Sequence, residues 1–368
     1  MTERKQFIVI GAGLLGLFVT RELARRGRDV LCVEQATIGH ERAGSKGTTR
    51  LFRYGYTDPF YVRLAMRSLI GWSRLSEESG LRLLEPTGLL SLGYGLDELV
   101  TAMADGGATS EFVVGEELAE RFPAVSVPGR AVFEATAGVL HADEILSVLA
   151  RSAGGFGAEI LEGARVSALD VDDDGVRLEL PEGRRECDVV LLCGGAWSGE
   201  LATAAGLDAG GIFRPSLQQV AYLQPKTRLL GGVPAFVERG PVTYYGLPAL
   251  AEGHYKIGIH DPGETVTPAA VALDDDPVAL ELLVAAAERL LPGFRAEPVR
   301  TERLLRQHTQ RRLRHRSRGP RRHRRRDLRS RIQVRSPLGR GARRPGRGHL
   351  ALGAARAPLA RPPPLTAA

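Results

Sequence analysis

The sequence predicts an α/β protein in which a parallel βαβ unit opens the chain and a second, α+β unit on an antiparallel sheet completes it. An apolar run at residues 7–10 leads into a glycine-rich turn and an amphipathic stretch, and a second apolar run at residues 29–33 ends in Glu34. Short apolar runs between turn residues recur from residue 218 to residue 259, which is typical of antiparallel strands. With 368 residues, the chain is long enough to bury two cores.

The first turn reads Gly-Ala-Gly-Leu-Leu-Gly, and each of its glycines has a physical reason. Gly11 permits the tight turn, Gly13 lets the backbone approach a pyrophosphate, and Gly16 lets the following helix pack closely on the strand. The pyrophosphate would lie at the N-terminus of a helix over residues 14–26, where N–H groups and the helix dipole favour negative charge. These features predict a Rossmann-type dinucleotide-binding domain; the alternative is a glycine-rich turn that binds no nucleotide.

Two features narrow the choice of dinucleotide. Glu34 follows the second strand and can accept hydrogen bonds from ribose hydroxyls, which favours a free ribose over the 2′-phosphate of NADP. A later apolar strand over residues 187–193 ends in Gly194 and Gly195, and such a second glycine-terminated strand is typical of flavoproteins. We therefore expect FAD, with Val166 as a further contact of the cofactor.

The remaining elements follow from the same periodicities. Helical spacing of apolar residues predicts further helices near residues 61–79, 96–103, 115–121, 143–153 and 276–291. Apolar or alternating runs predict strands near residues 88–92, 131–133, 158–161, 165–180, 218–223, 235–237, 242–245 and 255–259. We assign residues 1–80 and 141–210 to a discontinuous FAD-binding domain, and residues 81–140 and 211–300 to a substrate domain.

The net charge of +7 hides a strong asymmetry along the chain. Residues 304–368 contain 20 arginines, no lysine and one acid, so this tail carries +19 while residues 1–303 carry −12. The tail has no aromatic residue and few apolar side chains in its densest part. Because such a composition cannot offset the entropy of ordering, we expect the tail to be disordered. A basic arm that binds nucleic acid is disfavoured, since it lacks aromatic rings for stacking on bases.

Other classes of protein are excluded by simpler features. The three cysteines, Cys32, Cys187 and Cys193, have no metal-ligand spacing, and their odd number favours a reducing, cytoplasmic compartment. No run approaches the roughly 18 apolar residues of a membrane helix, and the first apolar run is too short for a signal peptide. We expect no metal and no membrane partner.

Three further segments carry a specific resemblance. They are Gly-Ser-Lys-Gly-Thr-Thr-Arg-Leu-Phe-Arg at residues 44–53, Gly-Val-Leu-His-Ala-Asp at residues 138–143, and Tyr-Tyr-Gly-Leu-Pro at residues 244–248 followed by Lys-Ile-Gly-Ile-His at residues 256–260. With the glycine turn, they resemble the family of monomeric sarcosine oxidase and N-methyltryptophan oxidase over about residues 6–303. The resemblance implies a monomeric amine oxidase that uses FAD; we give residues 138–143 no catalytic role.

The arginines of the first segment match two family positions. In that family, the first arginine lies near the flavin and the second binds the substrate carboxylate, and Arg50 and Arg53 occupy these places. An arginine fork suits a planar carboxylate better than a lysine does. The alternative is a pair of surface arginines on a loop.

The third segment supplies the rest of the expected catalytic set. The family assigns the activation of dioxygen to a lysine on the strand after the Tyr-Tyr-Gly turn, and Lys256 matches it with the same spacing from Tyr245. A buried cation stabilises the charge that dioxygen acquires when it is reduced. His260 resembles a histidine of the family's active site. The alternatives are a strand lysine whose head reaches solvent and a structural histidine.

The implied reaction removes a hydride equivalent from the carbon next to a secondary amine, and the resulting imine is hydrolysed. An N-methyl amino acid would give formaldehyde, the demethylated amino acid and hydrogen peroxide, so an amine or amino acid and dioxygen are the expected partners. One alternative is an oxidase or dehydrogenase of a cyclic imino acid or a biosynthetic amine. The other is an inactive flavin-binding protein.

The resemblance stops near Leu304. Beyond this point the family has a cysteine that holds FAD covalently and, later, Gly-His-Gly-Phe-Lys, whereas the tail contains neither Cys nor Lys. We therefore expect FAD to be bound non-covalently. A frameshift in a GC-rich gene is our hypothesis, because codons for Tyr-Asp-Asn-Thr-Pro-Asn read one nucleotide early can give Leu-Arg-Gln-His-Thr-Gln, the sequence of residues 305–310. Resequencing would overturn it if no one-nucleotide correction restored both family features.

Overall fold

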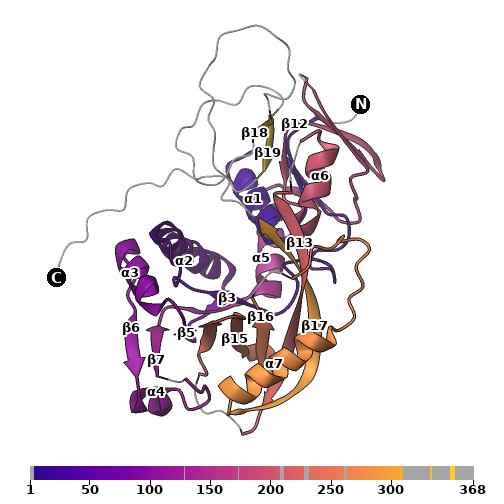
Figure 1. Ribbon diagram of the computed structural model, residues 1–368. Helices are drawn as coiled ribbons and strands as arrows, with labels where there is room; N and C mark the ends of the chain where they lie inside the picture. Colours follow the sequence, from indigo (N-terminus) through magenta and orange to yellow (C-terminus); the bar gives the residue numbers. More distant parts are fainter. Residues whose placement is uncertain are drawn as a thin grey trace, which may run out of the picture. The chain divides into compact units, whose positions relative to one another are not determined.

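The computed structural model describes residues 4–127, 129–172, 174–207, 211–227, 232–260 and 263–309, and two short strands at residues 332–333 and 349–352. The chain divides into two compact units (Figure 1). One unit comprises residues 1–38, 149–212 and 309–368, and the other comprises residues 39–148 and 213–308. Each unit has its own sheet and its own core.

The first unit is built on a mixed sheet with the strand order β10-β11-β12-β1-β2-β9. Four of these strands run parallel, namely β12 (Gly183–Leu192), β1 (Arg4–Ile10), β2 (Val30–Val33) and β9 (Glu159–Leu161). An antiparallel pair, β10 (Ala168–Val171) and β11 (Val176–Leu180), extends the sheet beside β12. Ile10 lies opposite both Leu192 and Val33, so three parallel strands end at one edge.

The helices of this unit follow the ends of those strands. α1 (Leu14–Arg25) connects β1 to β2, and η1 (Gly195–Trp197) and α6 (Ser198–Ala204) follow β12. The βαβ opening predicted from the sequence is therefore confirmed. Within the tail, β19 (His349–Leu352) pairs parallel to β12, and β18 (Ile332–Gln333) pairs with β19. Of the segment 304–368 that we expected to be disordered, residues 304–309 also belong to a strand, and the other residues lie outside the described part of the chain.

The second unit is built on an eight-stranded sheet with the order β17-β13-β16-β15-β14-β5-β7-β6. Its strands are β5 (Leu89–Gly93), β6 (Glu111–Val114), β7 (Arg130–Glu134), β13 (Phe213–Pro225), β14 (Ala235–Arg239), β15 (Tyr244–Ala249), β16 (His254–Ile259) and β17 (Phe294–Thr309). A smaller sheet has the order β3-β8-β4, formed by β3 (Thr49–Phe52), β8 (Gly138–His141) and β4 (Leu84–Glu85). The predicted antiparallel sheet is present, with one parallel pair between β14 and β5.

The two faces of the large sheet have different roles. α7 (Pro277–Leu290) packs Leu283 and Leu290 against one face, where the side chains of Phe236 and Tyr255 are also buried. Asp276 caps α7, since its carboxylate accepts the N–H groups of the second and third helical residues. The opposite face carries most of the polar residues considered below. The remaining helices are α2 (Pro59–Ser79), α3 (Leu96–Gly106), α4 (Glu116–Arg121) and α5 (Ala142–Gly155).

The boundaries of the units differ from those that we expected from the sequence. Residues 39–80 and 141–148 group with the second unit, because β3 pairs with β8 and α2 packs against α3. The predicted start of the tail at residue 304 also falls inside β17, which continues to Thr309. Leu304 is buried against Val220 and Tyr222 of β13, and this apolar contact extends the strand past the predicted break.

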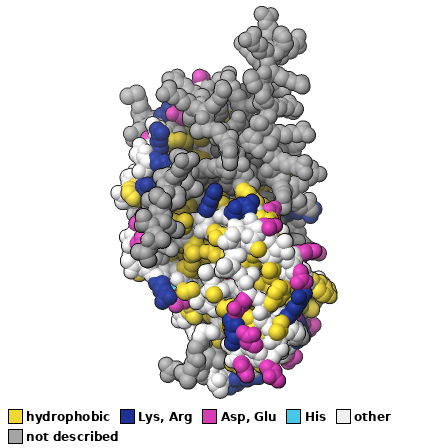
Figure 2. Space-filling model, turned by 90° about the vertical axis from the view of Figure 1, so that its left-hand side faces the viewer, with side chains coloured by type: hydrophobic (Ala, Val, Ile, Leu, Met, Phe, Trp, Pro, Cys, Tyr) yellow, Lys and Arg dark blue, Asp and Glu magenta, His cyan; other side chains and the backbone are white. Residues whose placement is uncertain are grey.

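The described residues show two further features of the chain. None of their helices is long and apolar enough to cross a membrane, and they contain no group of three or more His, Cys, Asp or Glu side chains that could hold a metal ion. On the described part of the face in Figure 2, many basic side chains lie next to acidic ones. Elsewhere among the described residues, Arg130 pairs with Asp97, with 2.6 Å between Nη2 and Oδ2.

Candidate active site

The glycine turn of the first unit is built so that only glycines fit at two of its positions. Gly11 has a φ of +103°, and a Cβ there would lie 2.5 Å from the carbonyl oxygen of Cys193. A Cβ on Gly16 would lie 1.8 Å from the carbonyl oxygen of Gly11. Gly13 precedes α1 as its N-cap, and neither a capping side chain nor an acid lies in the first turn of the helix. This turn therefore fits the pyrophosphate of a dinucleotide.

Glu34 lies against the same turn. Its Oε2 accepts the N–H of Ala12 at 2.8 Å and its Oε1 accepts the N–H of Ala36 at 3.2 Å, and the residue is 7% exposed. The carboxylate therefore braces the turn, at the place where the dinucleotide fold positions an acid for a ribose hydroxyl. The N–H of Ala164 donates to the carbonyl of Glu34, which holds the half-buried Val166 two residues further along the same segment.

The paired glycines lie at the end of β12. The N–H of Cys193 donates to the carbonyl of Ile10 at 2.8 Å. The ends of β1 and β12, which lead into the two glycine segments, are therefore hydrogen-bonded to each other. A Cβ on Gly194 would lie 2.4 Å from Leu201 Cδ1, and Gly195 has a φ of +53°. Both segments thus carry glycines at this edge of the sheet, which suits a close approach of the backbone to a cofactor.

In the second unit, strand pairing puts several predicted residues on one face of the large sheet. Tyr245 lies opposite Gly258 on β16, and a Cβ at Gly258 would lie 2.6 Å from the tyrosine ring, so the glycine makes room for it. Lys256 lies two residues before Gly258 and directly opposite Tyr222 on β13. His260 lies two residues after Gly258. Because alternate residues share a face, Tyr245, Lys256 and His260 belong to the same side of the sheet.

The two arginines of the 44–53 segment differ in their surroundings. Nη1 of Arg50 donates to the carbonyl of Thr49 at 2.7 Å, and Nη2 donates to the carbonyl of Gly44 at 2.9 Å. The Arg53 guanidinium lies over the ring of Tyr56 at 5.1 Å and has no ion pair with a carboxylate in the described part of the chain. Arg50 therefore braces its own loop, whereas the Arg53 guanidinium has no ion pair among the described residues.

Lys256 is 2% exposed, and its ammonium lies 5.5 Å from the centre of the Tyr222 ring. Burial lowers the pKa of Lys256 to about 7, and the charge of Arg50 acts in the same direction, while Glu302 opposes it. The lysine can therefore gain or lose its proton near neutral pH, and such a shifted pKa is common among functional groups.

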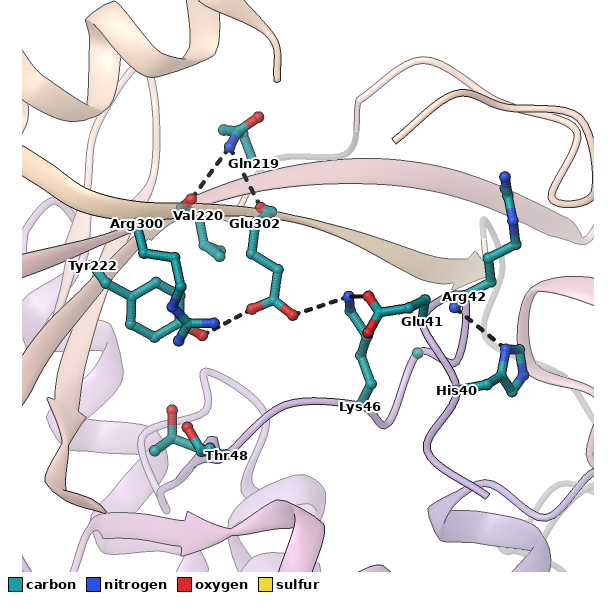
Figure 3. Close-up of polar contacts among 12 residues, drawn as sticks. His40, Glu41, Arg42, Lys46, Thr48, Gln219, Val220, Tyr222, Arg300 and Glu302 are labelled. Atoms are coloured by element: carbon teal, nitrogen blue, oxygen red, sulfur yellow. Dashed lines mark hydrogen bonds and ion pairs between the residues drawn. The ribbon is translucent and has the colours of Figure 1, made fainter. Parts of the chain in front are cut away.

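Figure 3 shows a hydrogen-bonded network around Glu302, and one of its members, Tyr222, has its ring centre 5.5 Å from the ammonium of Lys256. Glu302 accepts the hydroxyl of Tyr222 at 2.9 Å and the ammonium of Lys46 at 3.1 Å, and Lys46 also pairs with Glu41 at 2.6 Å. The Arg300 guanidinium stacks 3.7 Å from the Tyr222 ring. Burial alone would raise the pKa of Glu302, but the Tyr222 hydrogen bond and the nearby lysines lower it, so this carboxylate stays ionised.

Tyr245 and His260 form an edge-to-face pair, with 6.4 Å between their ring centres. Burial raises the pKa of the Tyr245 hydroxyl. The N–H of His260 donates to the carbonyl of Thr243 at 2.8 Å, and Nδ1 of its ring lies 3.2 Å from Nη1 of Arg306. Both rings are therefore fixed in position beside Lys256.

Glu134, at the end of β7, is a buried acid that the sequence analysis did not single out. It is 2% exposed, and its carboxylate accepts the N–H groups of Tyr54 and Gly55, directly after Arg53. Burial raises the pKa of Glu134 to about 7, although these N–H groups and the charges of Arg53 and Arg239 act in the opposite direction. Glu134 thus anchors the backbone that carries Arg53.

The pKa of Glu134 predicts a pH-dependent stability. The folded protein binds this proton more tightly than the unfolded chain, whose glutamate has a pKa near 4.5. The free energy of unfolding should therefore fall as the pH rises from about 4.5 to about 7, by roughly 3 kcal/mol. The Glu134→Gln variant cannot ionise, so its urea unfolding curves should lack this fall, whereas the exposed Glu116→Gln control should keep it. Equal pH slopes in all three proteins would show that Glu134 is already ionised in the fold.

Sequence reasoning also missed Tyr222, Arg239 and Glu302. Tyr222 and Glu302 lie on strands that meet Lys256 only through the pairing of β17, β13 and β16. That pairing cannot be read from local periodicity. Glu134 could have been found, because it directly follows the apolar run 131–133 and a charged residue is uncommon at the end of a buried strand.

Comparisons with known proteins identify the family of the chain. A family profile described as "FAD dependent oxidoreductase" matches residues 6–324. The chain is 28% identical to the monomeric sarcosine oxidase of Bacillus sp. (strain B-0618) over 311 residues, which cover 81% of this chain and 79% of that protein. It is 27% identical over 304 residues to the N-methyl-L-tryptophan oxidase of Salmonella arizonae, with 78% of this chain and 79% of that protein covered.

Solved structures show the same fold. The open form of NikD, described as an unusual amino acid oxidase essential for nikkomycin biosynthesis, superposes with a TM-score of 0.73 at 24% identity. The match covers 83% of this chain and 82% of that structure. At this identity the likeness establishes the fold alone.

Proposed function

Because the chain belongs to the family of FAD-dependent oxidoreductases, with the family profile covering residues 6–324, we propose that it oxidises a secondary or N-methylated amino acid with dioxygen. The observation that carries this proposal is that one unit holds both the Arg53 guanidinium, which has no ion pair among the described residues, and a buried lysine, Lys256. The sarcosine and N-methyltryptophan oxidases among the relatives support the substrate class.

The glycine turn and Glu34 would hold the FAD dinucleotide, as their fit to a pyrophosphate supports. The chemistry that FAD would supply when bound is a two-electron oxidation: a hydride, which carries both electrons, would leave the carbon next to the substrate nitrogen, and the two electrons would end on dioxygen. The oxidised amine takes up water and separates into an aldehyde and the shorter amine. For an N-methyl substrate, one dioxygen and one water are consumed, and formaldehyde, the amino acid and hydrogen peroxide are formed.

The residues of the second unit orient the substrate and place charge beside the reacting groups. Arg53 binds the α-carboxylate with its fork of N–H groups, and this contact positions the N-alkyl carbon. Lys256 provides a positive charge where dioxygen becomes negative. Glu302 holds Lys46 and the Tyr222 ring in place, and so keeps the surroundings of Lys256 fixed. Tyr245 and His260 wall the site beside the lysine.

We also propose that FAD is held non-covalently. The three cysteines of the chain are buried free thiols, and burial raises the pKa of each to about 12, which leaves no thiolate to attack a flavin. Acid precipitation of the purified protein should then leave the yellow flavin in the supernatant. A yellow pellet would contradict this. The protein is expected to be a monomer, as the name of one relative states for that protein.

Product analysis tests the proposed function. An N-methyl amino acid should give formaldehyde and hydrogen peroxide in equal amounts, each matching the dioxygen consumed. A cyclic secondary amino acid should give peroxide without formaldehyde, which separates the two substrate classes. Primary amino acids that were oxidised faster than their N-methyl derivatives would contradict the proposal.

A further inference from the structure

Two arginines of the second unit meet at Glu134 without forming an ion pair. Arg53 follows β3, and Arg239 is the last residue of β14. In the described part of the chain, neither guanidinium lies within 4.0 Å of a carboxylate. Nη1 of Arg239 is buried and has no hydrogen-bond partner among the described residues. A buried guanidinium N–H without a partner costs free energy that a ligand can recover.

The strand register places these groups on one face of the sheet. Leu89 of β5 lies opposite both Glu134 of β7 and Ala235 of β14, so these residues share one face of the sheet. Arg239 lies four residues after Ala235 and therefore belongs to that face too. It is also the face of Tyr245 and Lys256, because Val237 of β14 lies opposite Tyr245. Arg239 thus projects from the same face of the sheet as the residues proposed to bind substrate.

The charges of Arg53, Arg239 and Glu134 do not balance one another. Burial lowers the pKa of Arg239, and the positive charge of Arg53 lowers it further, so the two guanidinium groups are close enough to repel each other. The charge of Glu134 acts on Arg239 in the opposite direction, and burial raises the pKa of Glu134 itself to about 7. Two guanidinium groups and one carboxylate leave one positive charge unbalanced, and two when Glu134 is protonated, which suits a ligand with two anionic groups.

We propose that Arg53 and Arg239 bind two carboxylates of one substrate, so that the preferred substrate is an N-alkylated amino acid with an acidic side chain. Arg53 takes the α-carboxylate and Arg239 takes the carboxylate of the side chain. This inference rests on the proposed function, since it names the substrate class of the same site. It differs in assigning a specificity-determining role to Arg239, a residue outside every motif that the sequence presents.

Activity with matched substrates tests the role of Arg239. The unchanged enzyme should oxidise N-methylaspartate with a higher kcat/KM than N-methylalanine. In the Arg239→Gln variant, kcat/KM for N-methylaspartate should fall about 10- to 100-fold, the usual effect of losing a hydrogen bond to a charged group, while the value for N-methylalanine changes little. The Arg130→Gln variant, which removes an exposed arginine paired with Asp97, is the control and should leave both values unchanged.

A binding measurement separates this inference from the proposed function. Succinate should perturb the visible flavin spectrum at lower concentration than butyrate does. The Arg239→Gln substitution should weaken the binding of succinate and leave the binding of butyrate unchanged. If Arg239 only neutralises Glu134, the variant will lower kcat/KM for both substrates equally, and the inference is wrong. If the unchanged enzyme prefers N-methylalanine, the inference again fails while the proposed function stands. If a flavin-containing protein oxidises neither substrate, the proposed function fails, and succinate binding still decides the role of Arg239.

Discussion

The Lys256→Met enzyme, once reduced by its substrate, should react with dioxygen about 10²- to 10³-fold more slowly than the unchanged enzyme, the usual effect of removing one preorganised charge. Methionine fills the space of the buried lysine without its charge, so the strand pairing of Tyr222 and Leu247 with residue 256 should survive. The measurement is a stopped-flow experiment in which anaerobically reduced enzyme is mixed with aerated buffer. The rate at which the substrate reduces the enzyme should change far less.

The pH dependence of the same rate carries a second signature of Lys256. Because burial lowers the pKa of this lysine to about 7, its cationic form predominates below that pH and is lost above it. The reaction of the unchanged enzyme with dioxygen should therefore slow as the pH rises through about 7, and the methionine variant should lack this step. The Lys226→Met variant, which removes an exposed lysine, is the matched control. A Lys256→Met enzyme with the rate and pH profile of that control would refute the assignment.

Replacing Arg53 by glutamine should lower kcat/KM for an N-methyl amino acid about 100-fold or more, because a charge-assisted pair of hydrogen bonds to the carboxylate is lost. The Arg53→Lys variant should recover only part of the activity, since an ammonium keeps the charge without the planar fork. Steady-state kinetics with all three proteins measure this series.

The carboxamide of the same substrate is the control for Arg53. It lacks the negative charge, so the unchanged enzyme should use it poorly and the Arg53→Gln variant should lose little further. If the variant lost the same factor on the acid and on the amide, Arg53 would act on the fold and not on the carboxylate. Unfolding curves of the variant would then show the loss of stability directly.

The dinucleotide end of the fold could be predicted because its signals are local. Gly11 and Gly16 are required by contacts within one turn, and the strands beside them are short apolar runs. By contrast, β17 was not predicted. It reads Phe-Arg-Ala-Glu-Pro-Val-Arg-Thr-Glu-Arg-Leu-Leu-Arg-Gln-His-Thr, which is polar and contains Pro298, and it lies at the edge of the sheet, where both features are tolerated.

The candidate site was only partly accessible from the sequence. Arg50, Arg53, Tyr245, Lys256 and His260 belong to motifs, so their positions could be named, and their roles remain predictions. Glu134, Arg239 and Glu302 belong to none. They reach the site through the pairing of strands that are distant in sequence, such as β7 with β5 and β5 with β14. Local periodicity gives the face of a strand but not its neighbour, which is why these three were missed.

The central claim is that this chain is an FAD-dependent oxidase of N-alkylated amino acids. The most direct test is to add an N-methyl amino acid to the purified, flavin-containing protein without oxygen and to follow the visible absorbance of oxidised flavin. The absorbance should disappear, and it should return with release of hydrogen peroxide when air is admitted. A flavin absorbance that no N-methyl or cyclic secondary amino acid diminishes, or one that air does not restore, would contradict the claim.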